Sequence, residues 1–519
     1  MSMGKSKAPF DRIRIARSTC VAAALVLIPH AARSATWFVE TGIVGDVTAT
    51  NNSNFDTSNT RESDLIVSIS PTIALRGEGR RLKVAGAAAL SAVTYVEGTQ
   101  ASSFDPVGTF SANLEAIENW FFIDASLSAT RSVENPLAPR QEGPTSFNRQ
   151  TDLTARLSAY IDRAFPNDLR LLIRSDNSWT DTRRGEEPTP TEYAARSFFR
   201  FSRTPRPFGW ALEAERRRDD RVDLGTDATV YYSLARLRMG YVFSGQLEFG
   251  LRGGYEKSEL FVDDSARSFY GAELSWRPSE RTRLEGFWED RSFGDAWSLT
   301  FTHRSPFVAW DWRSGRDLTT YDDAYLTVPA GGDLAGLLDA ALQTRIVDPV
   351  ERARAVEEFI AKRGLPRSLS GPINIFSDQV EVRTSRVGTV TLIGNRSTLA
   401  LSGYYQRDEL PSGDAFGLVP GAGSIFRQYG ASLAYSLRTS GISSVVASVA
   451  LTRDEGSATS SLVAVPTGDS RQQTYRVQYD RQLAPRTTGF VGVRYQTFDS
   501  DVINDSTETA VFAGLGHRF

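Results

Sequence analysis

The sequence predicts an all-β fold: a transmembrane antiparallel up-and-down β-barrel of about 22 strands, within a range of 18–22. Three observations indicate it. Segments of about ten residues alternate apolar and polar side chains, short and long connections alternate between them, and aromatic residues gather at their ends. Composition agrees, because 59 Lys plus Arg against 62 Asp plus Glu and a single Cys exclude a basic nucleic-acid binder and a disulfide scaffold.

Residues 1–34 have the three parts of a secretory signal peptide. Basic residues between Lys5 and Arg17 precede the apolar core Val21–Ile28, and small residues at Ala32 and Ser34 form a cleavage site. We therefore expect cleavage before residue 35 and a mature outer-membrane β-barrel over residues 35–519. The expected location is the outer membrane of a Gram-negative bacterium, after secretion across the inner membrane.

The first strands show the repeating pattern. In Asp64–Arg76 the odd positions from Leu65 to Leu75 are apolar and polar residues lie between them, which is the period of a strand with one apolar face. Gly77–Arg80 then turns the chain, and Leu82–Ala92 alternates again. Short links of this kind alternate with long polar stretches such as Asp408–Phe426. Transmembrane barrels have this asymmetry between periplasmic turns and extracellular loops.

Aromatic residues and the last strand support a membrane location. Trp37 and Trp276 fall at short-turn ends of strands, and Trp288 and Tyr495 fall toward long-loop ends, as expected for two interfacial girdles. The final strand ends in Phe519 with apolar residues in phase behind it. This end resembles the C-terminal signature by which the barrel-assembly machinery recognises outer-membrane barrels, and the resemblance implies that Phe519 is that signal.

The pattern is weakest around the region 314–375. Alternation is least regular in Phe307–Arg313 and Phe376–Leu392, where Arg386 falls on an otherwise apolar face. Between them alternation is lost, and helical spacing with capping residues at Asp333 and Asp348 predicts a helical-hairpin insert. We expect it to act as a lid or plug in the barrel mouth; the alternatives are an extracellular cap and a partner-binding knob. The predicted gate or plug residues, which form the apolar faces of the two helices, are Leu334, Leu337, Leu338, Val356, Phe359 and Ile360.

Arginines on the polar face of the strands are the candidate substrate-path residues. They are predicted to point into the lumen: Arg156, Arg174, Arg196, Arg200, Arg236, Arg238, Arg252, Arg476 and Arg494. One interpretation is a cationic track for an anionic polymer, because the guanidinium binds carboxylates and phosphates in a bidentate manner. The other is a structural lattice of Arg–carboxylate pairs, which the interleaved acidic residues favour.

The sequence does not predict an enzyme, a cofactor or a metal site. His303 and His517 are the histidines of the mature region, and neither is accompanied by a metal-ligand or nucleophile pattern. Glu285 and Glu289 share a strand face, but a strand rise places them about 13 Å apart, too far for a glycosidase pair. We therefore predict no catalytic residues.

The layout as a whole resembles the PEP-CTERM-system-associated outer-membrane barrels that are linked to exopolysaccharide loci. The features that carry the resemblance are the insert from Asp348–Arg352 to Gly364–Pro366, the turn Gly394–Leu399, the barrel over nearly all of the mature region and the terminal Phe519. It implies exopolysaccharide export or surface assembly through a gated conduit. The alternatives are a general or substrate-specific porin and a structural or adhesive barrel. Expected partners are outer-membrane lipid and lipopolysaccharide, a polysaccharide substrate, a periplasmic export partner and the assembly machinery, but not nucleic acid.

Overall fold

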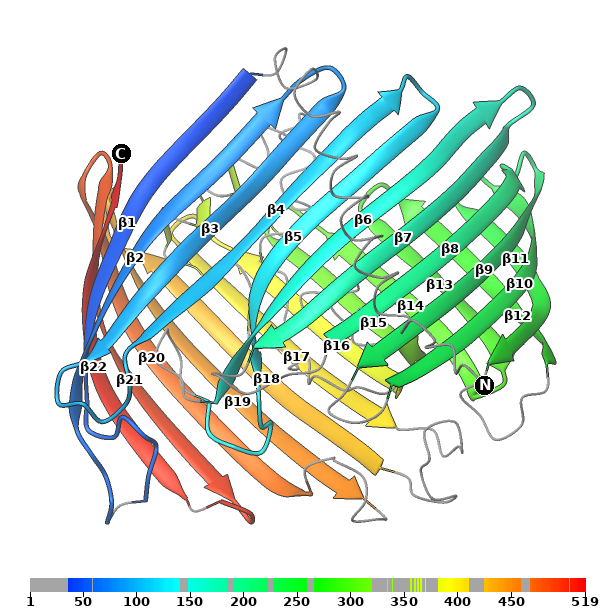
Figure 1. Ribbon diagram of the computed structural model, residues 1–519. Coiled ribbons are helices and arrows are strands. Elements are labelled where there is room, and N and C mark those ends of the chain that lie inside the picture. Colours follow the sequence, from blue (N-terminus) through cyan, green and yellow to red (C-terminus); the bar gives the residue numbers. More distant parts are fainter. Residues whose placement is uncertain are drawn as a thin grey trace, which may run out of the picture.

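The chain forms one closed antiparallel barrel (Figure 1). The computed structural model describes residues 36–57, 59–140, 148–183, 191–222, 227–258, 266–319, 381–409, 424–458, 467–503 and 505–519, and ten single positions between 334 and 369. These ranges contain 22 strands, each paired with its neighbours in sequence, and β1 pairs with β22 to close the barrel. The predicted barrel of about 22 strands is therefore confirmed.

The strands of the first half are β1 (Thr36–Thr50), β2 (Asp64–Glu78), β3 (Leu82–Tyr95), β4 (Ser103–Ile117), β5 (Phe121–Val133), β6 (Arg149–Phe165), β7 (Leu169–Arg183), β8 (Thr191–Arg203), β9 (Phe208–Val222), β10 (Asp227–Ser244) and β11 (Leu247–Ser258). The strands of the second half are β12 (Arg267–Ser279), β13 (Thr282–Arg291), β14 (Gly294–Arg304), β15 (Val308–Thr319), β16 (Glu381–Ile393), β17 (Ser397–Glu409), β18 (Ser424–Arg438), β19 (Ser443–Ala458), β20 (Gly468–Ala484), β21 (Thr487–Ser500) and β22 (Ser506–Arg518).

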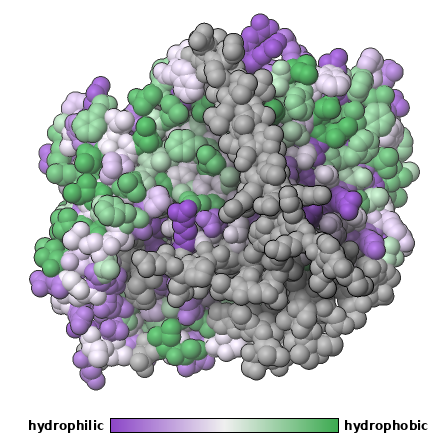
Figure 2. Space-filling view, in the orientation of Figure 1, coloured by the Kyte–Doolittle hydropathy of each residue, from purple (hydrophilic) through white to green (hydrophobic). Residues whose placement is uncertain are grey.

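Alternation along each strand separates an apolar outer face from a polar inner face. On β21, Val491 and Val493 are 47% and 50% exposed, whereas Arg494 and Gln496 are 6% and 0% exposed. A protein surrounded by water would bury the valines and expose the arginine, so the solvent of the outer face is lipid. Figure 2 shows apolar side chains over much of the described outer surface, with hydrophilic ones at its upper and lower edges. The fold is that of an outer-membrane β-barrel.

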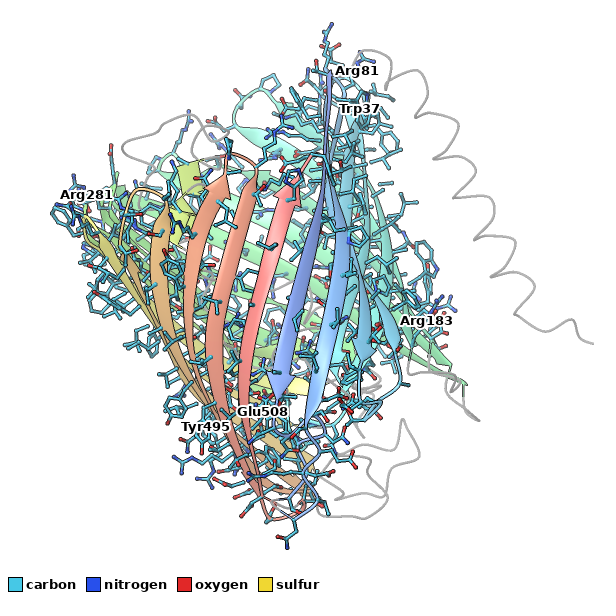
Figure 3. All side chains as sticks on the ribbon, turned by 90° about the vertical axis from the view of Figure 1, so that its left-hand side faces the viewer. Trp37, Arg81, Arg183, Arg281, Tyr495 and Glu508 are labelled. Carbon is cyan, nitrogen blue, oxygen red and sulfur yellow. The ribbon has the colours of Figure 1, made fainter. Side chains whose placement is uncertain are left out.

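Short turns lie at one rim and long connections at the other, as the sequence predicts. The three-residue turn between β6 and β7 places Asn167 and Asp168 at φ of 63° and 61°, a left-handed backbone that these residue types tolerate. Trp37 and Arg81 lie at the short-turn rim, and Tyr495 and Glu508 lie toward the opposite rim (Figure 3). In barrels of this kind the short-turn rim faces the periplasm.

The region between β15 and β16 differs from the prediction. Residues 314–319 continue β15 and do not belong to an insert. The part of the chain that the structure describes contains no bounded helix, so the predicted helical hairpin is not supported as an element. Individual positions have helical backbone, among them Leu334, Leu338, Val356 and Ile360.

No helix among the described residues is long and apolar enough to span a bilayer.

Candidate functional site in the barrel lumen

Cross-strand pairing places all nine predicted substrate-path arginines on the inner face of the wall. Arg156 pairs with Ser178 and Arg174 with Phe198, and the same face continues through Arg196 and Arg236 to the other strands. Arg476 and Arg494 face each other across β20 and β21. The arginines therefore lie around most of the lumen and do not form a single column.

Five of the nine belong to two neighbouring groups of ion pairs, here together called the charge lattice, that cross six neighbouring strands. Arg196, Glu215 and Arg217 form the smaller group, and the larger one is built around Glu213, Glu273 and Glu289. The members of the charge lattice are Arg196, Arg200, Arg217, Arg236, Arg238, Arg252 and Arg291 with Glu213, Glu215, Glu256, Glu273 and Glu289. Glu289 is fully buried, accepts hydrogen bonds from Arg236 at 2.9 Å and Arg291 at 3.0 Å, and forms an ion pair with Arg252 at 3.0 Å. Arg252 also lies 4.1 Å from the ring centroid of Phe287. Arginines that neutralise carboxylates on adjacent strands brace the wall, which agrees with the structural-lattice interpretation.

The remaining predicted arginines have separate surroundings. Arg174 binds Asp176 at 2.6 Å and Asp124 at 3.3 Å. Arg494 binds Glu508 at 2.7 Å, and Glu508 also accepts from Thr50 at 2.9 Å, so this pair joins β21, β22 and β1 at the closing seam. Arg476 donates to Gln478 at 2.6 Å and lies over the ring of Phe512.

Five of the six predicted plug residues lie against the inner face of the barrel wall. Leu334, Leu338, Val356 and Ile360 form one buried apolar cluster with Ala400 on β17 and Ala434 on β18, and Phe359 packs against it; Leu337 lies outside the described residues. Ala400 and Ala434 are cross-strand partners whose side chains share the inner face with Ser402. We call the described residues between Leu334 and Leu369 the inserted segment, and the small alanine side chains let it approach the wall closely.

The inserted segment reaches the periplasmic rim. Arg363 donates to the carbonyl oxygens of Gly394 and Asn395, at 3.3 and 3.1 Å, in the short turn between β16 and β17. Its own carbonyl oxygen accepts from Ser436 at 2.5 Å. The described residues of the segment therefore lie at the periplasmic end of the lumen, beside the short-turn ends of β16, β17 and β18.

A second internal segment, the strap Asn135–Arg140 that follows β5, has no counterpart in the sequence prediction. The side chain of Gln472 on β20 binds both backbone groups of Arg140, accepting from its N–H at 3.0 Å and donating to its carbonyl oxygen at 2.6 Å. The guanidinium of Arg140 pairs with Asp454 on β19, whose side chain is 3% exposed. The strap therefore runs from the long-loop end of β5 to the inner face of β19 and β20.

The base of the strap is also fixed. Asn148 donates to the carbonyl oxygens of Asn135 and Ala138 and accepts from the N–H of Asn135 at 2.7 Å. Leu137 and Ala138 are buried. These contacts satisfy the polar backbone groups that a buried loop would otherwise leave unpaired.

Space remains along the wall formed by β1–β5. A cavity of about 430 Å³ is bordered on this wall by small inner-face residues, including Gly42, Thr72, Ala74, Ala87 and Thr109. A larger cavity of about 1330 Å³ opens at the periplasmic end, between β1, β2, β20, β22 and the inserted residues Ile360, Lys362 and Leu365. Thr72 and Ala74 border both cavities. We call the inner face of β1–β5 around Gly42, Thr72, Ala74, Ala87 and Thr109 the small-residue wall.

The histidines are structural. His303 hydrogen-bonds Thr282 through Nδ1 at 2.8 Å, and His517 hydrogen-bonds Thr487 at 2.9 Å. Both lie on the outer face of their strands, paired with outward residues such as Trp310 and Ile43. Over the described ranges, no group of His, Cys, Asp and Glu side chains could hold a metal ion.

No protein-family model and no curated protein matches this sequence. Similar solved structures include the siderophore receptor PirA from Acinetobacter baumannii, with a TM-score of 0.48 and 8% identity over 92% of this chain and 80% of that chain. The FrpB iron transporter from Neisseria meningitidis gives 0.38 and 9%, covering 92% and 82%. The anion-selective porin from Comamonas acidovorans gives 0.32 and 10%, covering 93% and 100%. No ligand or role is carried over from these proteins.

Proposed function

We propose that this protein is a gated outer-membrane conduit for a hydrophilic polymer. The observation that carries the proposal is the position of the inserted segment, which packs on the inner face of β17 and β18 and reaches the periplasmic turn at Gly394. A barrel of this size encloses a lumen wide enough to need a plug. The strap supplies a second closure at the other rim.

Exopolysaccharide is the polymer class that we propose for the conduit. The family resemblance of the sequence supports this class. The small-residue wall also supports it, because it offers hydroxyl groups such as Thr72 and Thr109 and little bulk to an extended sugar chain. Every carboxylate of the charge lattice is paired with arginine and the lattice braces the wall opposite, so we assign it a structural role rather than that of a cationic track.

The test measures conductance and polymer export together. Replacing Leu334, Leu338, Val356 and Ile360 by Asp puts carboxylates into the apolar cluster and should detach the inserted segment from the wall. We expect weak conductance of the wild-type protein in planar bilayers and a several-fold larger conductance of the variant. Gly245→Asp is the control, because an added side chain there meets open space in a turn.

The alternative functions give different results. A general porin would conduct strongly and constitutively before any substitution, and deleting it would leave secreted polymer unchanged. A structural or adhesive barrel would conduct in neither form. The conduit proposal requires both a conductance that rises in the variant and a loss of surface polymer in cells that lack the protein.

A further inference from the structure

Five arginines form a cluster on the lipid-facing side of the barrel, in the halves of β16–β20 nearest the long-loop rim. This outer arginine patch consists of Arg386, Arg407, Arg427, Arg453 and Arg471. Register fixes their direction, because Arg386 pairs with Tyr405 and Arg453 with Tyr429, whereas the lumen-facing Ser402 and Gln406 alternate with these positions. The patch covers the outside of the same strands whose inner face holds the inserted segment.

The patch carries more positive than negative charge. Glu409 binds Arg407 at 2.5 Å, Glu455 binds Arg453 at 2.9 Å, and Asp469 binds Arg453 at 3.1 Å. Arg386 and Arg471 are exposed, and among the described residues no carboxylate forms an ion pair with either; Asp499 is the cross-strand neighbour of Arg471. The guanidinium of Arg386 lies 5.7 Å from the ring centroid of Tyr405. Two guanidinium groups are thus open toward the membrane.

The level of the patch explains how lipid-facing arginines are tolerated. Tyr405 and Tyr429 are neighbouring outward rings with centroids 5.4 Å apart, and tyrosines in this position mark the membrane–water interface. Charged side chains on the outer face of a barrel are costly at the midplane and nearly free at the interface. At the interface they meet lipid headgroups rather than hydrocarbon.

Lipid with several phosphates in the outer leaflet fits this surface best. Guanidinium forks bind phosphate oxygens in pairs, and clustered arginines at a membrane surface recognise anionic headgroups. Below the arginines the outer face continues with Leu401, Gly403 and Ala431, which offer an apolar surface with a shallow centre to acyl chains. We propose that the outer arginine patch is a binding site for the phosphate groups of lipid A, the membrane anchor of lipopolysaccharide.

The experiment measures binding of fluorescent lipid A to the whole protein in phosphatidylcholine nanodiscs. Each arginine near a headgroup contributes about a fivefold factor in affinity, so the double variant Arg386→Gln/Arg471→Gln should bind lipid A about 25-fold more weakly than the wild type. Arg183→Gln is the matched control, because Arg183 lies toward the long-loop rim of β7, away from the patch (Figure 3), and is paired with Asp181. Its affinity should be unchanged.

Three results would overturn the proposal. The double variant could bind lipid A with the affinity of the wild type, or the wild type could bind dephosphorylated lipid A, or phosphatidylglycerol, as tightly as it binds lipid A. A folded barrel migrates differently on gels before and after heating. A double variant that keeps this difference has lost the binding site and not the fold. The site lies outside the lumen, so its failure would leave the conduit proposal untouched, and conductance would report on that proposal alone.

Discussion

The strap gives the sharpest test of gating, through the ion pair between Arg140 and Asp454. Arg140→Asp places two carboxylates together at a site where the Asp454 side chain is 3% exposed and the arginine side chain 16% exposed. Breaking a buried ion pair costs about 3–5 kcal/mol. The partial exposure of Arg140 favours the lower value of about 3 kcal/mol, which corresponds to a change of about two orders of magnitude in the ratio of undocked to docked strap.

Reversing both charges distinguishes loss of the Arg140–Asp454 attraction from other effects of the substitutions. Asp454→Arg alone should undock the strap by a similar amount, whereas the combined Arg140→Asp/Asp454→Arg variant restores an attractive pair. The backbone contacts of Gln472 to Arg140 do not depend on the arginine side chain, so the docked strap can form them in every variant. A coupling energy near zero in this cycle would contradict the assigned role of the ion pair.

The assay is thiol labelling at the strap. The sequence has a single Cys, Cys20, within the predicted signal peptide, so Ala138→Cys introduces one reporter into the expected mature barrel. Ala138 is 8% exposed, and a membrane-impermeant maleimide should react with Cys at this position only when the strap undocks. We expect labelling about 100-fold faster in Arg140→Asp than in the parent, and near the parental rate after charge reversal. Identical rates in all variants would refute docking through this pair.

Three further predictions concern the barrel wall. Arg494→Ala leaves Glu508 buried without its partner at the closing seam and should lower the unfolding free energy in liposomes by about 3–5 kcal/mol. The control Arg170→Ala removes an exposed pair and should lower it by about 1 kcal/mol or less. Similar losses in the two variants would contradict a stabilising role of the Arg494–Glu508 pair. Val511→Arg, near the middle of the outer face of β22, should cost about 2–4 kcal/mol in the same titration, and Leu515→Arg, nearer the rim, should cost less. Ala87→Trp puts an indole into the small-residue wall and should reduce polymer export; added to the variant with Asp at Leu334, Leu338, Val356 and Ile360, it should also reduce conductance. Ala88→Trp, on the lipid face, should leave both quantities unchanged. Equal effects of the two substitutions would exclude a passage along this wall.

The barrel could be predicted from sequence because its signals are local. Each strand has lipid on one side, so a window of ten residues such as Asp64–Arg76 already carries the period of two, and Gly77–Arg80 marks the turn. The same period predicts which arginines face the lumen. Arg386 breaks the apolar pattern of β16 because it lies at the interface beside Tyr405, where the outer face is no longer purely hydrocarbon.

The interior could not be predicted to the same extent. The strap contacts join Arg140 to Asp454 and Gln472, more than 300 residues away, and no periodic pattern encodes such a pairing. Asn135 and Asn148, which fix the base of the strap, have the residue type of any polar loop. The apolar spacing of Leu334 and Leu338 predicted a buried face, but the surface that covers it, Ala400 and Ala434, became evident only from the register of β17 and β18.

The distribution of contacts around the lumen indicates which parts can move. The charge lattice ties β8–β13 together and the Arg494–Glu508 pair ties the closing seam, so the wall is braced over much of its circumference in addition to its continuous hydrogen-bonded ladder. By contrast, the strap ends in one ion pair and a few side-chain hydrogen bonds. Opening by widening the barrel would break many buried pairs at once, whereas undocking the described strap residues breaks one ion pair and a few hydrogen bonds. We therefore expect any gating motion to occur inside a wall that keeps its shape.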